Sequence, residues 1–548
     1  MLGDARLSPY LPNAQRGLAF LACVMKQLYL FLGFLLSISM GWAQKATSPK
    51  FPVEPRQPAR AELLLEAYSS DVQVQPLLED SSLVLLVERD PILSGKSEYY
   101  FQKFNHDLQP IRRADIPVPR GYDFQSLCSE GTDVYAIFSG VDPGTLWVAA
   151  FDSRTGELGT GEFKTKRTRG IHELKALDGK LFVTVEVDQH LTILLLDLHT
   201  AKFQFLPSVY EPLPTRFTFL ADSVTKRAEL ILSETNGFKS RLQLKQLSDD
   251  GRLIRSEFVQ ASSERGLLDA QLSPGDSAAR LLAGTYTLRD SRYSQGLFAS
   301  DLTAGVTSTG QRRSLRYYDF LNLKHFFDFM KPAKVARMRQ RSERLRASDR
   351  QFRHRYQLLM HDMVATSEGF VLVSEVYYPR YNNSNLNYGN LGSLANYGYG
   401  GFGYPSRYNN FYNNRRASEG FRTTHALICG FDRQGNLLWD NSFLLKEIEH
   451  LQLQETVRMR PLSDGRRMAM AYLKDDEFHY KVVDQAASAP NDWQVTLRPA
   501  DPTAKTNDTS QEHLLTWYGG RFLACGYQHV RPEKGPGRDV FFLNVLEF

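Results

Sequence analysis

The stretch Phe151-Asp152-Ser153-Arg154-Thr155-Gly156-Glu157-Leu158 combines an apolar strand end, an aspartate turn and the start of a new apolar strand. An aspartate can accept hydrogen bonds from the backbone N–H groups of its own turn, and glycine can adopt a positive φ. A near copy runs from Phe431 to Leu438, and looser copies begin at Leu196, Ser248 and Val483. Neighbouring copies lie roughly 45–55 residues apart, which is the interval of a blade in a β-propeller.

Short apolar segments separated by Gly, Pro, Asp and Asn fill most of the chain, and helical periodicity is almost absent. This pattern predicts an all-β fold. The segments with the strongest strand pattern are 82–88, 99–104, 133–138, 146–151, 180–187, 191–196, 228–232, 242–247, 280–288, 296–300, 369–377, 425–431, 467–473, 479–483, 521–526 and 540–546.

Grouping these strands in fours gives about eight sheets, with seven as the alternative. A row of sheets leaves two outer faces uncovered, whereas a ring covers every face, so we predict a β-propeller over residues 61–548. The last unit lacks a fourth strand. The segment Ala61–Tyr68 is a spare strand at the other end of the chain, and we expect it to complete the last sheet.

The charge of the chain is nearly balanced for its length of 548 residues. Lysine and arginine number 66 and aspartate and glutamate number 61, which gives a formal net charge of +5. A general nucleic-acid binder is more strongly basic, so we expect no nucleic-acid partner. The apolar content of 42% is sufficient for a packed core.

Residues 1–43 have the pattern of a secretory signal peptide. Met25 and Lys26 supply a short positive region, and Leu28–Ile38 is an apolar run too short to span a bilayer comfortably. We take Met25 as the expected true start, and a retained membrane anchor is the alternative. A proline-spaced linker, 44–60, follows. We therefore expect an exported protein in the periplasm or at the cell surface.

Three cysteines follow the expected signal peptide. Cys128, Cys429 and Cys525 each lie in an apolar, strand-like setting, which predicts buried and inert thiols. One disulfide with one thiol left over is the alternative in an oxidising compartment. The chain has no Cys-x-x-Cys pair and no zinc-ligand spacing, so we expect neither a metal nor a cofactor.

A first insertion, 319–355, has the one convincing helical pattern in the chain. Its first part places four apolar residues on one helical face, and Pro332 then breaks or kinks the helix. These four residues are Phe320, Leu323, Phe327 and Met330. The second part, Lys334–Arg355, has nine lysines and arginines against two acidic residues.

The basic helix is a candidate binding element, with Arg337, Arg341 and Arg344 as its expected contacts. An exposed basic side chain gains about 1 kcal/mol near an anionic surface. The helix is therefore a candidate for docking an acidic partner or for peripheral contact with a membrane. The alternative is a solvated helix that packs on the propeller rim through its apolar first half.

A second insertion, 377–416, is rich in Tyr, Asn and Gly and has no acidic residue. We expect a long loop between two strands of one blade. Tyrosine gives a large contact area with only two torsions to fix, so this loop is a candidate contact for a glycan or protein. An insertion without a ligand is the alternative. The candidate residues are Tyr397, Tyr399, Tyr404 and Tyr408.

The phrase that ends in Trp439 resembles the repeat of quinoprotein-like β-propellers. Blades of that family carry an aspartate, a Thr-Gly turn and a tryptophan four residues after the glycine, as Gly435 and Trp439 are spaced here. The copy Asp152–Gly156 matches the first part, and Thr160 stands at the tryptophan position. The family includes quinone-dependent dehydrogenases, whose adjacent cysteine pair this chain lacks, and a non-catalytic propeller of outer-membrane barrel assembly. The resemblance implies a non-catalytic, secreted bacterial member with degenerate repeats.

Catalytic motifs are absent from the sequence. A glycosidase needs two carboxylates about 5–10 Å apart, and no spacing indicates such a pair. The chain has no Gly-x-Ser-x-Gly elbow, phosphate loop or zincin motif. We predict an exported, non-enzymatic propeller that acts as a protein-interaction scaffold in the cell envelope. The alternatives are an enzyme acting on polysaccharide or another envelope polymer at the channel mouth, and a glycan-binding module.

Overall fold

The computed structural model describes residues 54–89, 97–165, 168, 170–212, 216–222, 225–236, 239–261, 264–275, 280–303, 315–381, 418–487 and 493–548. Residues 54–548 form one compact unit, and residues 1–53 form a separate unit that lies outside the described part. The signal peptide predicted at 1–43 therefore falls outside the described residues.

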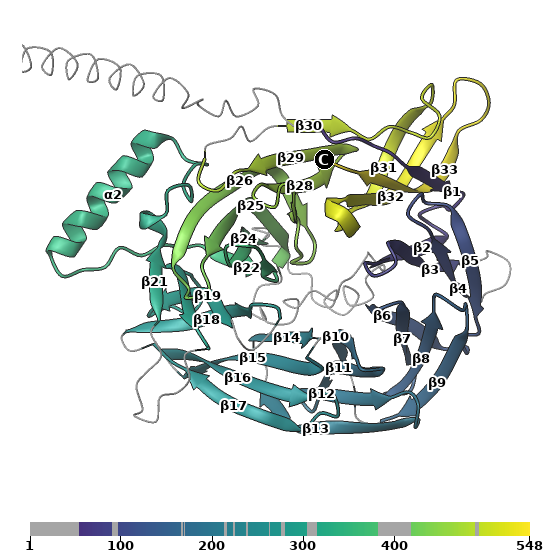
Figure 1. Ribbon diagram of the computed structural model, residues 1–548, viewed down its shortest axis with the longest axis horizontal. Coiled ribbons are helices and arrows are strands. Elements are labelled where there is room, and N and C mark those ends of the chain that lie inside the picture. Colours follow the sequence, from purple (N-terminus) through teal and green to yellow (C-terminus); the bar gives the residue numbers. More distant parts are fainter. Residues whose placement is uncertain are drawn as a thin grey trace, which may run out of the picture. The chain divides into compact units, whose positions relative to one another are not determined.

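Eight antiparallel sheets form a ring, and we number them as blades 1 to 8 in chain order (Figure 1). Blade 1 contains β2 (Ser70–Leu77), β3 (Ser82–Arg89), β4 (Glu98–Phe104) and β5 (Pro110–Ile116). Blade 2 contains β6 (Tyr122–Glu130), β7 (Asp133–Gly140), β8 (Thr145–Asp152) and β9 (Leu158–Lys164). Blade 3 contains β10 (Gly170–Leu177), β11 (Lys180–Val187), β12 (His190–Asp197) and β13 (Lys202–Pro212). Blade 4 contains β14 (Arg216–Asp222), β15 (Arg227–Asn236), β16 (Lys239–Ser248) and β17 (Leu253–Val259).

The second half of the ring follows the same order. Blade 5 contains β18 (Arg265–Leu272), β19 (Leu281–Leu288), β20 (Gly296–Asp301) and β21 (Arg316–Asp319). Blade 6 contains β22 (Gln357–Met360), β24 (Phe370–Tyr381), β25 (Ser418–Phe431) and β26 (Leu437–His450), and the short β23 (Val364–Ala365) also pairs with β24. Blade 7 contains β27 (Arg458–Pro461), β28 (Met468–Lys474), β29 (Glu477–Val483) and β30 (Trp493–Thr496). Blade 8 contains β31 (Lys505–Thr516), β32 (Phe522–Arg531), β33 (Arg538–Leu546) and β1 (Arg60–Leu63).

The repeated aspartate phrase marks one structural position. All five copies lie at the turn from the third to the fourth strand of a blade, in blades 2, 3, 4, 6 and 7. Asp432 shows how the turn is stabilised, because its Oδ1 accepts the backbone N–H groups of Gln434 at 2.9 Å and Asn436 at 2.8 Å. Gly435 in the same turn has a φ of +81°, a conformation that favours glycine. The phrase therefore identifies the blades, as the sequence predicted.

Two further turns of this kind complete the series. In blade 1 the Oδ1 atom of Asn105 accepts the N–H of Asp107 at 3.0 Å, and in blade 5 that of Asp301 accepts the N–H of Thr303 at 2.8 Å. Asparagine replaces aspartate in the first turn, and neither turn was among the copies of the phrase found in the sequence.

The hydrophobic core lies between neighbouring blades rather than in one central cluster. Eight clusters of buried apolar side chains each join two neighbouring blades. One of them joins Val72 and Leu83 of blade 1 to Leu523 and Phe541 of blade 8, all essentially inaccessible to solvent. Every blade thus has a neighbour on both faces, and the all-β, eight-bladed ring predicted from the sequence is confirmed.

The N-terminal strand closes the ring. β1 is the outer strand of blade 8 and pairs antiparallel with β33, with Arg60 opposite Asn544 and Leu63 opposite Phe541. This confirms that the spare segment at Ala61–Tyr68 completes the last sheet, with the strand itself at Arg60–Leu63. Residues before β1 also contact blade 8, since the backbone N–H of Arg56 donates to the carbonyl of Glu547 at 2.7 Å.

The first insertion differs from its sequence prediction. Only Phe320–Asn322 forms a single 3₁₀ turn, η1, and the α-helix α2 begins at Pro332 and ends at Ala347. The helix predicted for the apolar first part is wrong, because the carboxylate of Asp440 accepts the backbone N–H groups of Lys324 and His325 and fixes this segment in an irregular conformation. Pro332 is the first residue of α2, where its missing N–H costs no helical hydrogen bond.

The second insertion lies between two strands of one blade, as predicted, although residues 377–381, predicted as part of the loop, belong to β24. β24 ends at Tyr381 and β25 begins at Ser418, and these two strands are antiparallel neighbours in blade 6. The insertion therefore connects two strands of one blade. Residues 382–417 lie outside the described part.

The three cysteines are buried and free, in agreement with the expectation of inert thiols. Burial raises the pKa of the Cys128 thiol to about 12, so this side chain stays protonated at neutral pH.

Candidate functional site

The basic helix α2 is anchored by a buried aromatic cluster next to blade 6. Phe320 and Phe326 stack with ring centroids 4.1 Å apart, and Tyr356 contacts both rings edge-on. Phe320 and Phe326 precede α2 in the sequence, whereas Tyr356 follows it, so the cluster holds the segments on both sides of the helix. We call this group of Phe320, Phe326, Phe327 and Tyr356 the aromatic anchor.

The imidazole of His425 lies against the same region and is uncharged. It stacks on Phe329 with ring centroids 4.2 Å apart, and its Nδ1 lies 3.0 Å from the hydroxyl of Thr424. Burial lowers the pKa of His425 to about 3, so this residue adds no charge beneath the helix at neutral pH.

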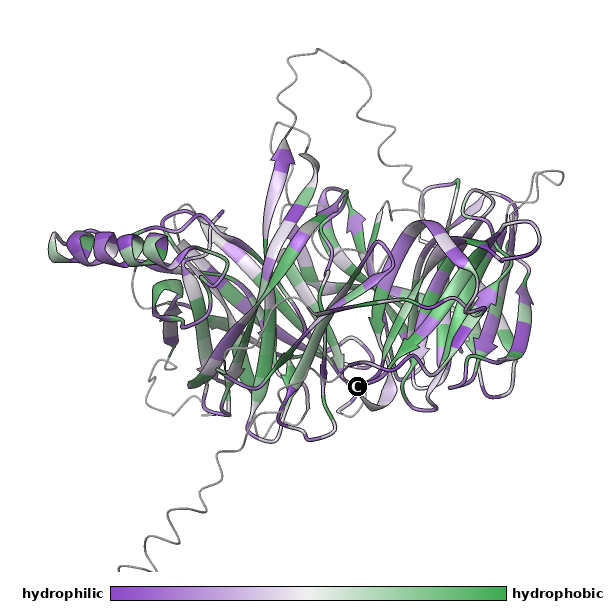
Figure 2. Cartoon of the chain, turned by 90° about the horizontal axis from the view of Figure 1, so that it is seen from above, coloured by the Kyte–Doolittle hydropathy of each residue, from purple (hydrophilic) through white to green (hydrophobic). Residues whose placement is uncertain are grey.

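One side of α2 faces the propeller. Val335, Met338, Ser342 and Leu345 are half-buried, and their spacing of three and four residues places them on one helical face. Val335 and Met338 pack against the apolar cluster between blades 5 and 6. No residue of the helix is fully buried, and α2 projects beside the ring with hydrophilic residues over most of its surface (Figure 2).

Four basic side chains form a second stripe along α2, beside the half-buried face. Lys334, Arg337, Arg341 and Arg344 recur at intervals of three and four residues, and all four are exposed. We call these four residues the basic stripe. The structure therefore brings together the three arginines that the sequence predicted as contacts and adds Lys334 to them.

The charge of α2 is unbalanced within the described part of the chain. The helix has six basic residues and one acidic residue, a formal net charge of +5, which equals the formal net charge of the whole chain. All six basic residues are exposed, and none forms an ion pair with another described residue. The arginines elsewhere in the ring are commonly paired, as Arg241 is with Glu234 at 2.7 Å. The positive charge of α2 is thus available to an external anionic group.

The tyrosines predicted as contacts cannot be placed relative to this helix. Tyr397, Tyr399, Tyr404 and Tyr408 lie in the segment 382–417, outside the described residues.

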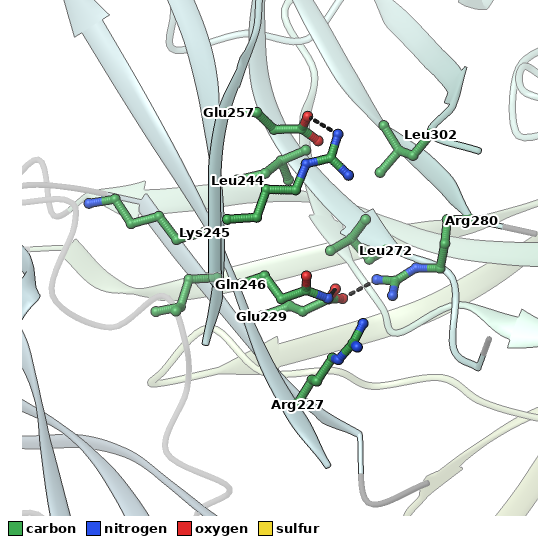
Figure 3. Close-up of a pocket in the computed structure, with 11 residues that line it drawn as sticks. Arg227, Glu229, Leu244, Lys245, Gln246, Glu257, Leu272, Arg280 and Leu302 are labelled. Carbon is green, nitrogen blue, oxygen red and sulfur yellow. Dashed lines mark hydrogen bonds and ion pairs between the residues drawn. The ribbon is translucent and has the colours of Figure 1, made fainter. Parts of the chain in front are cut away.

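A pocket of about 150 Å³ lies between blades 4 and 5 (Figure 3). On the blade 4 side, Glu229, Gln246 and Arg255 are cross-strand neighbours on β15, β16 and β17. On the blade 5 side, the guanidinium of Arg280 forms an ion pair with Glu229. Sequence reasoning missed this pocket because its residues come from two blades and carry no local motif.

A buried carboxylate elsewhere, that of Glu375 in blade 6, contacts the segment that leads into blade 7. The Oε1 atom of Glu375 accepts the backbone N–H groups of Thr456 at 2.8 Å and Val457 at 2.7 Å, and lies 2.9 Å from Nε2 of His361. Burial would lower the pKa of His361, and the charges of Glu455 and Glu375 outweigh burial and raise it. Within the described residues, no group of three or more His, Cys, Asp or Glu side chains could hold a metal ion.

The comparisons with known proteins return fold likeness only. No protein-family profile and no curated protein match the chain. Similar solved structures include the polysaccharide lyase Uly1, with 9% identity, a TM-score of 0.38 and coverage of 79% of this chain and 91% of that chain. They also include prolyl oligopeptidase B from Galerina marginata, with 9% identity, a TM-score of 0.37 and coverage of 85% and 56%.

A prolyl endopeptidase is a third similar structure, with 11% identity, a TM-score of 0.35 and coverage of 85% of this chain and 54% of that chain. The present chain spans little more than half the length of the two prolyl peptidases. Within the described residues, no helix has the length and apolar character needed to cross a membrane.

Proposed function

We propose that this protein is a non-enzymatic interaction scaffold of the cell envelope that docks an acidic surface of a partner protein through α2. The observation that carries the proposal is the charge of this helix. α2 has a net charge of +5, all of its basic side chains are exposed, and none of them is paired within the described part of the chain. The aromatic anchor holds the segments on both sides of the helix, and Val335 and Met338 of α2 pack against the same cluster.

A protein partner is favoured over a membrane by the position of the apolar side chains. A helix that binds at a membrane interface buries a broad apolar face among the lipids. In α2 the larger apolar side chains, Val335, Met338 and Leu345, are half-buried, and the first two pack against the propeller. The helix therefore retains no free apolar face for insertion, and its exposed surface is polar and basic.

The arrangement of the stripe suits carboxylates on a folded or extended acidic segment. A guanidinium presents its donors in a planar fork that matches a carboxylate, so arginine can bind two oxygens at once. Arg337, Arg341 and Arg344 are separated by about one helical turn each, roughly 5 Å along the axis. A partner with acidic residues at a similar spacing can engage them together.

The test measures binding of poly-L-glutamate to the protein at low salt. Lys334, Arg337, Arg341 and Arg344 are replaced together by glutamine, which preserves length and helix propensity. Exposed ion pairs contribute about 0.5 kcal/mol each, so the loss of four predicts an affinity roughly thirtyfold weaker. Wild-type affinity should also fall as salt is added, because salt screens exposed charges.

The matched control removes the same amount of charge from exposed positions elsewhere on the ring, by glutamine at Lys202, Arg433, Lys505 and Lys534. It should bind poly-L-glutamate as the wild type does. Equal losses of affinity in the two variants would mean that the net charge of the protein, and not the basic stripe, accounts for the binding. Binding to phosphatidylglycerol vesicles without binding to poly-L-glutamate would contradict an acidic protein partner and indicate a membrane instead.

Membership of the quinoprotein-like superfamily and export are further parts of this proposal. The repeated aspartate turns support membership of the superfamily. So does the position of Trp439, which packs so closely over Gly430 that a β-carbon there would come within 2.4 Å of the indole ring. Export is supported by the signal pattern at 1–43. Mass determination of the mature N-terminus should find Gln44 as the first residue, and a mature chain that still begins before residue 44 would contradict this cleavage.

A further inference from the structure

The pocket between blades 4 and 5 contains more basic than acidic side chains. Its lining includes the guanidinium groups of Arg227, Arg255 and Arg280 and the carboxylates of Glu229 and Glu257. Lys245 also borders the pocket, but its ammonium donates to the carbonyl of Ser208 and to Glu211, both in β13 of blade 3. Three positive and two negative groups therefore face the cavity.

The two carboxylates already have cationic or amide partners. Glu229 pairs with Arg280 and accepts the side-chain amide of Gln246 at 3.0 Å, and Glu257 pairs with Arg255 at 2.8 Å. The side chain of Arg227 is exposed and forms no ion pair or hydrogen bond with another described residue, and the Nε of Arg280 is buried without a hydrogen-bond partner. Arg227 and Arg280 thus retain unused donors, and they lie on adjacent sides of the same space (Figure 3).

The remaining wall is apolar. Leu244 of β16, Leu272 of β18 and Leu302, which follows β20, complete the lining. β21 pairs only with Gly296–Ala299 of β20, so the end of β20 beside Leu302 has no fourth-strand partner among the described residues. The pocket volume of about 150 Å³ is smaller than that of sites for drug-sized ligands.

We propose that this pocket binds a small organic carboxylate. Its carboxylate group pairs with the guanidinium groups of Arg227 and Arg280, and its short hydrocarbon part contacts Leu244, Leu272 and Leu302. Arginine favours carboxylate through paired N–H donors, and the leucines favour an apolar chain over a second charged group. The site is independent of α2, because none of its residues belongs to the insertion at 319–355.

The test is a ligand-observed NMR titration with acetate, propionate and butyrate, and with inorganic phosphate as a separate arm. Affinity should rise about fourfold for each added methylene, since each buries more apolar surface. Arg227→Gln should weaken butyrate binding about tenfold or more, because a charge-assisted pair is lost. Leu302→Ala should reduce the dependence on chain length, since Leu244 and Leu272 remain, and should leave acetate binding unchanged.

The control is Arg252→Gln, an 85% exposed arginine on the turn between β16 and β17, outside the pocket. This variant should bind butyrate with wild-type affinity, and thermal unfolding should be the same for all variants except Leu302→Ala. Tighter binding of phosphate than of butyrate would overturn the assignment to a carboxylate. Butyrate binding that is absent, or equal in the wild type and Arg227→Gln, would overturn the site itself.

Discussion

Single carboxylates connect neighbouring blades by accepting pairs of backbone N–H groups. Glu130 of blade 2 accepts those of Asp178 at 2.6 Å and Gly179 at 2.9 Å, in the first turn of blade 3. Glu512 of blade 8 accepts those of Asp475 and Asp476 in a turn of blade 7. Each of these carboxylates satisfies two donors that β-pairing leaves unused. In both cases the carboxylate lies in a different blade from the turn that it contacts, so the pairing becomes visible only in the ring.

Asp71 provides a test of burial at the scale of one residue. Burial, and then the nearby charge of Glu88, raise the pKa of Asp71 to about 7. Between about pH 4 and 7 the folded protein therefore keeps a proton that the unfolded chain has lost, so this group makes stability fall as pH rises through that window. Asp71→Asn should cancel the loss and raise the free energy of unfolding at pH 8 by about 2 kcal/mol. At pH 3 the substitution should have little effect.

Denaturant unfolding at several pH values measures this difference. Asp188→Asn, at an exposed turn residue with a φ of +49°, is the matched control and should preserve the wild-type profile. If Asp71→Asn and the wild type lose stability in parallel between pH 4 and 8, Asp71 is not the source of the dependence.

At the scale of elements, the sequence predicted one class of strand and missed another. Every segment with a strong apolar pattern is the second or third strand of a blade, such as β11, predicted at 180–187 and observed at Lys180–Val187. These strands have a neighbour on both edges and a blade on both faces, so most of their positions are buried, as in β11 and β19. The fourth strands face solvent along one edge, and β5 and β17 are largely exposed. Their polar sequences carry no clear alternation, and only the ring explains their pairing.

The first insertion shows the opposite error. Phe320, Leu323 and Phe327 have helical spacing, yet they fold as an irregular segment around the aromatic anchor. Apolar residues at helical spacing indicate that their side chains are buried together. Tertiary contacts decide whether the backbone between them is helical. The basic half of the insertion, in contrast, forms α2 beginning at Pro332.

Because β1 closes the ring, we expect a short N-terminal truncation that removes it to lower the stability of the protein strongly. A chain beginning at residue 66 lacks β1 and Leu65, which is 4% exposed in the cluster joining blades 8 and 1. It also lacks Leu63, which packs on that cluster, and the pairing with β33. Burial of two leucines and several strand hydrogen bonds together stabilise the ring by about 5 kcal/mol.

Thermal unfolding of this truncated chain should therefore begin well below that of a chain starting at residue 54, which retains β1 and serves as the control. Equal melting temperatures for the two chains would mean that the pairing of β1 with β33 does not stabilise the ring.

At the scale of the whole molecule, the two candidate sites differ in how far the sequence could reveal them. The basic stripe was visible because its residues are consecutive turns of one helix, so composition and spacing suffice. The pocket was not visible, because Arg227 and Arg280 are separated by a blade boundary and become neighbours only when blades 4 and 5 pack. The ring thus presents a charged helix at its rim and a small cleft between blades, and both depend on the same radial packing.

Hydrogen–deuterium exchange with and without poly-L-glutamate tests the docking role of α2 most directly, because it shows where on the molecule an acidic chain binds. We predict slower exchange of the backbone amides of residues 333–347 in α2, with the strands of distant blades 1 to 4 unchanged. Unchanged exchange in α2, together with protection elsewhere on the ring or none at all, would contradict the account.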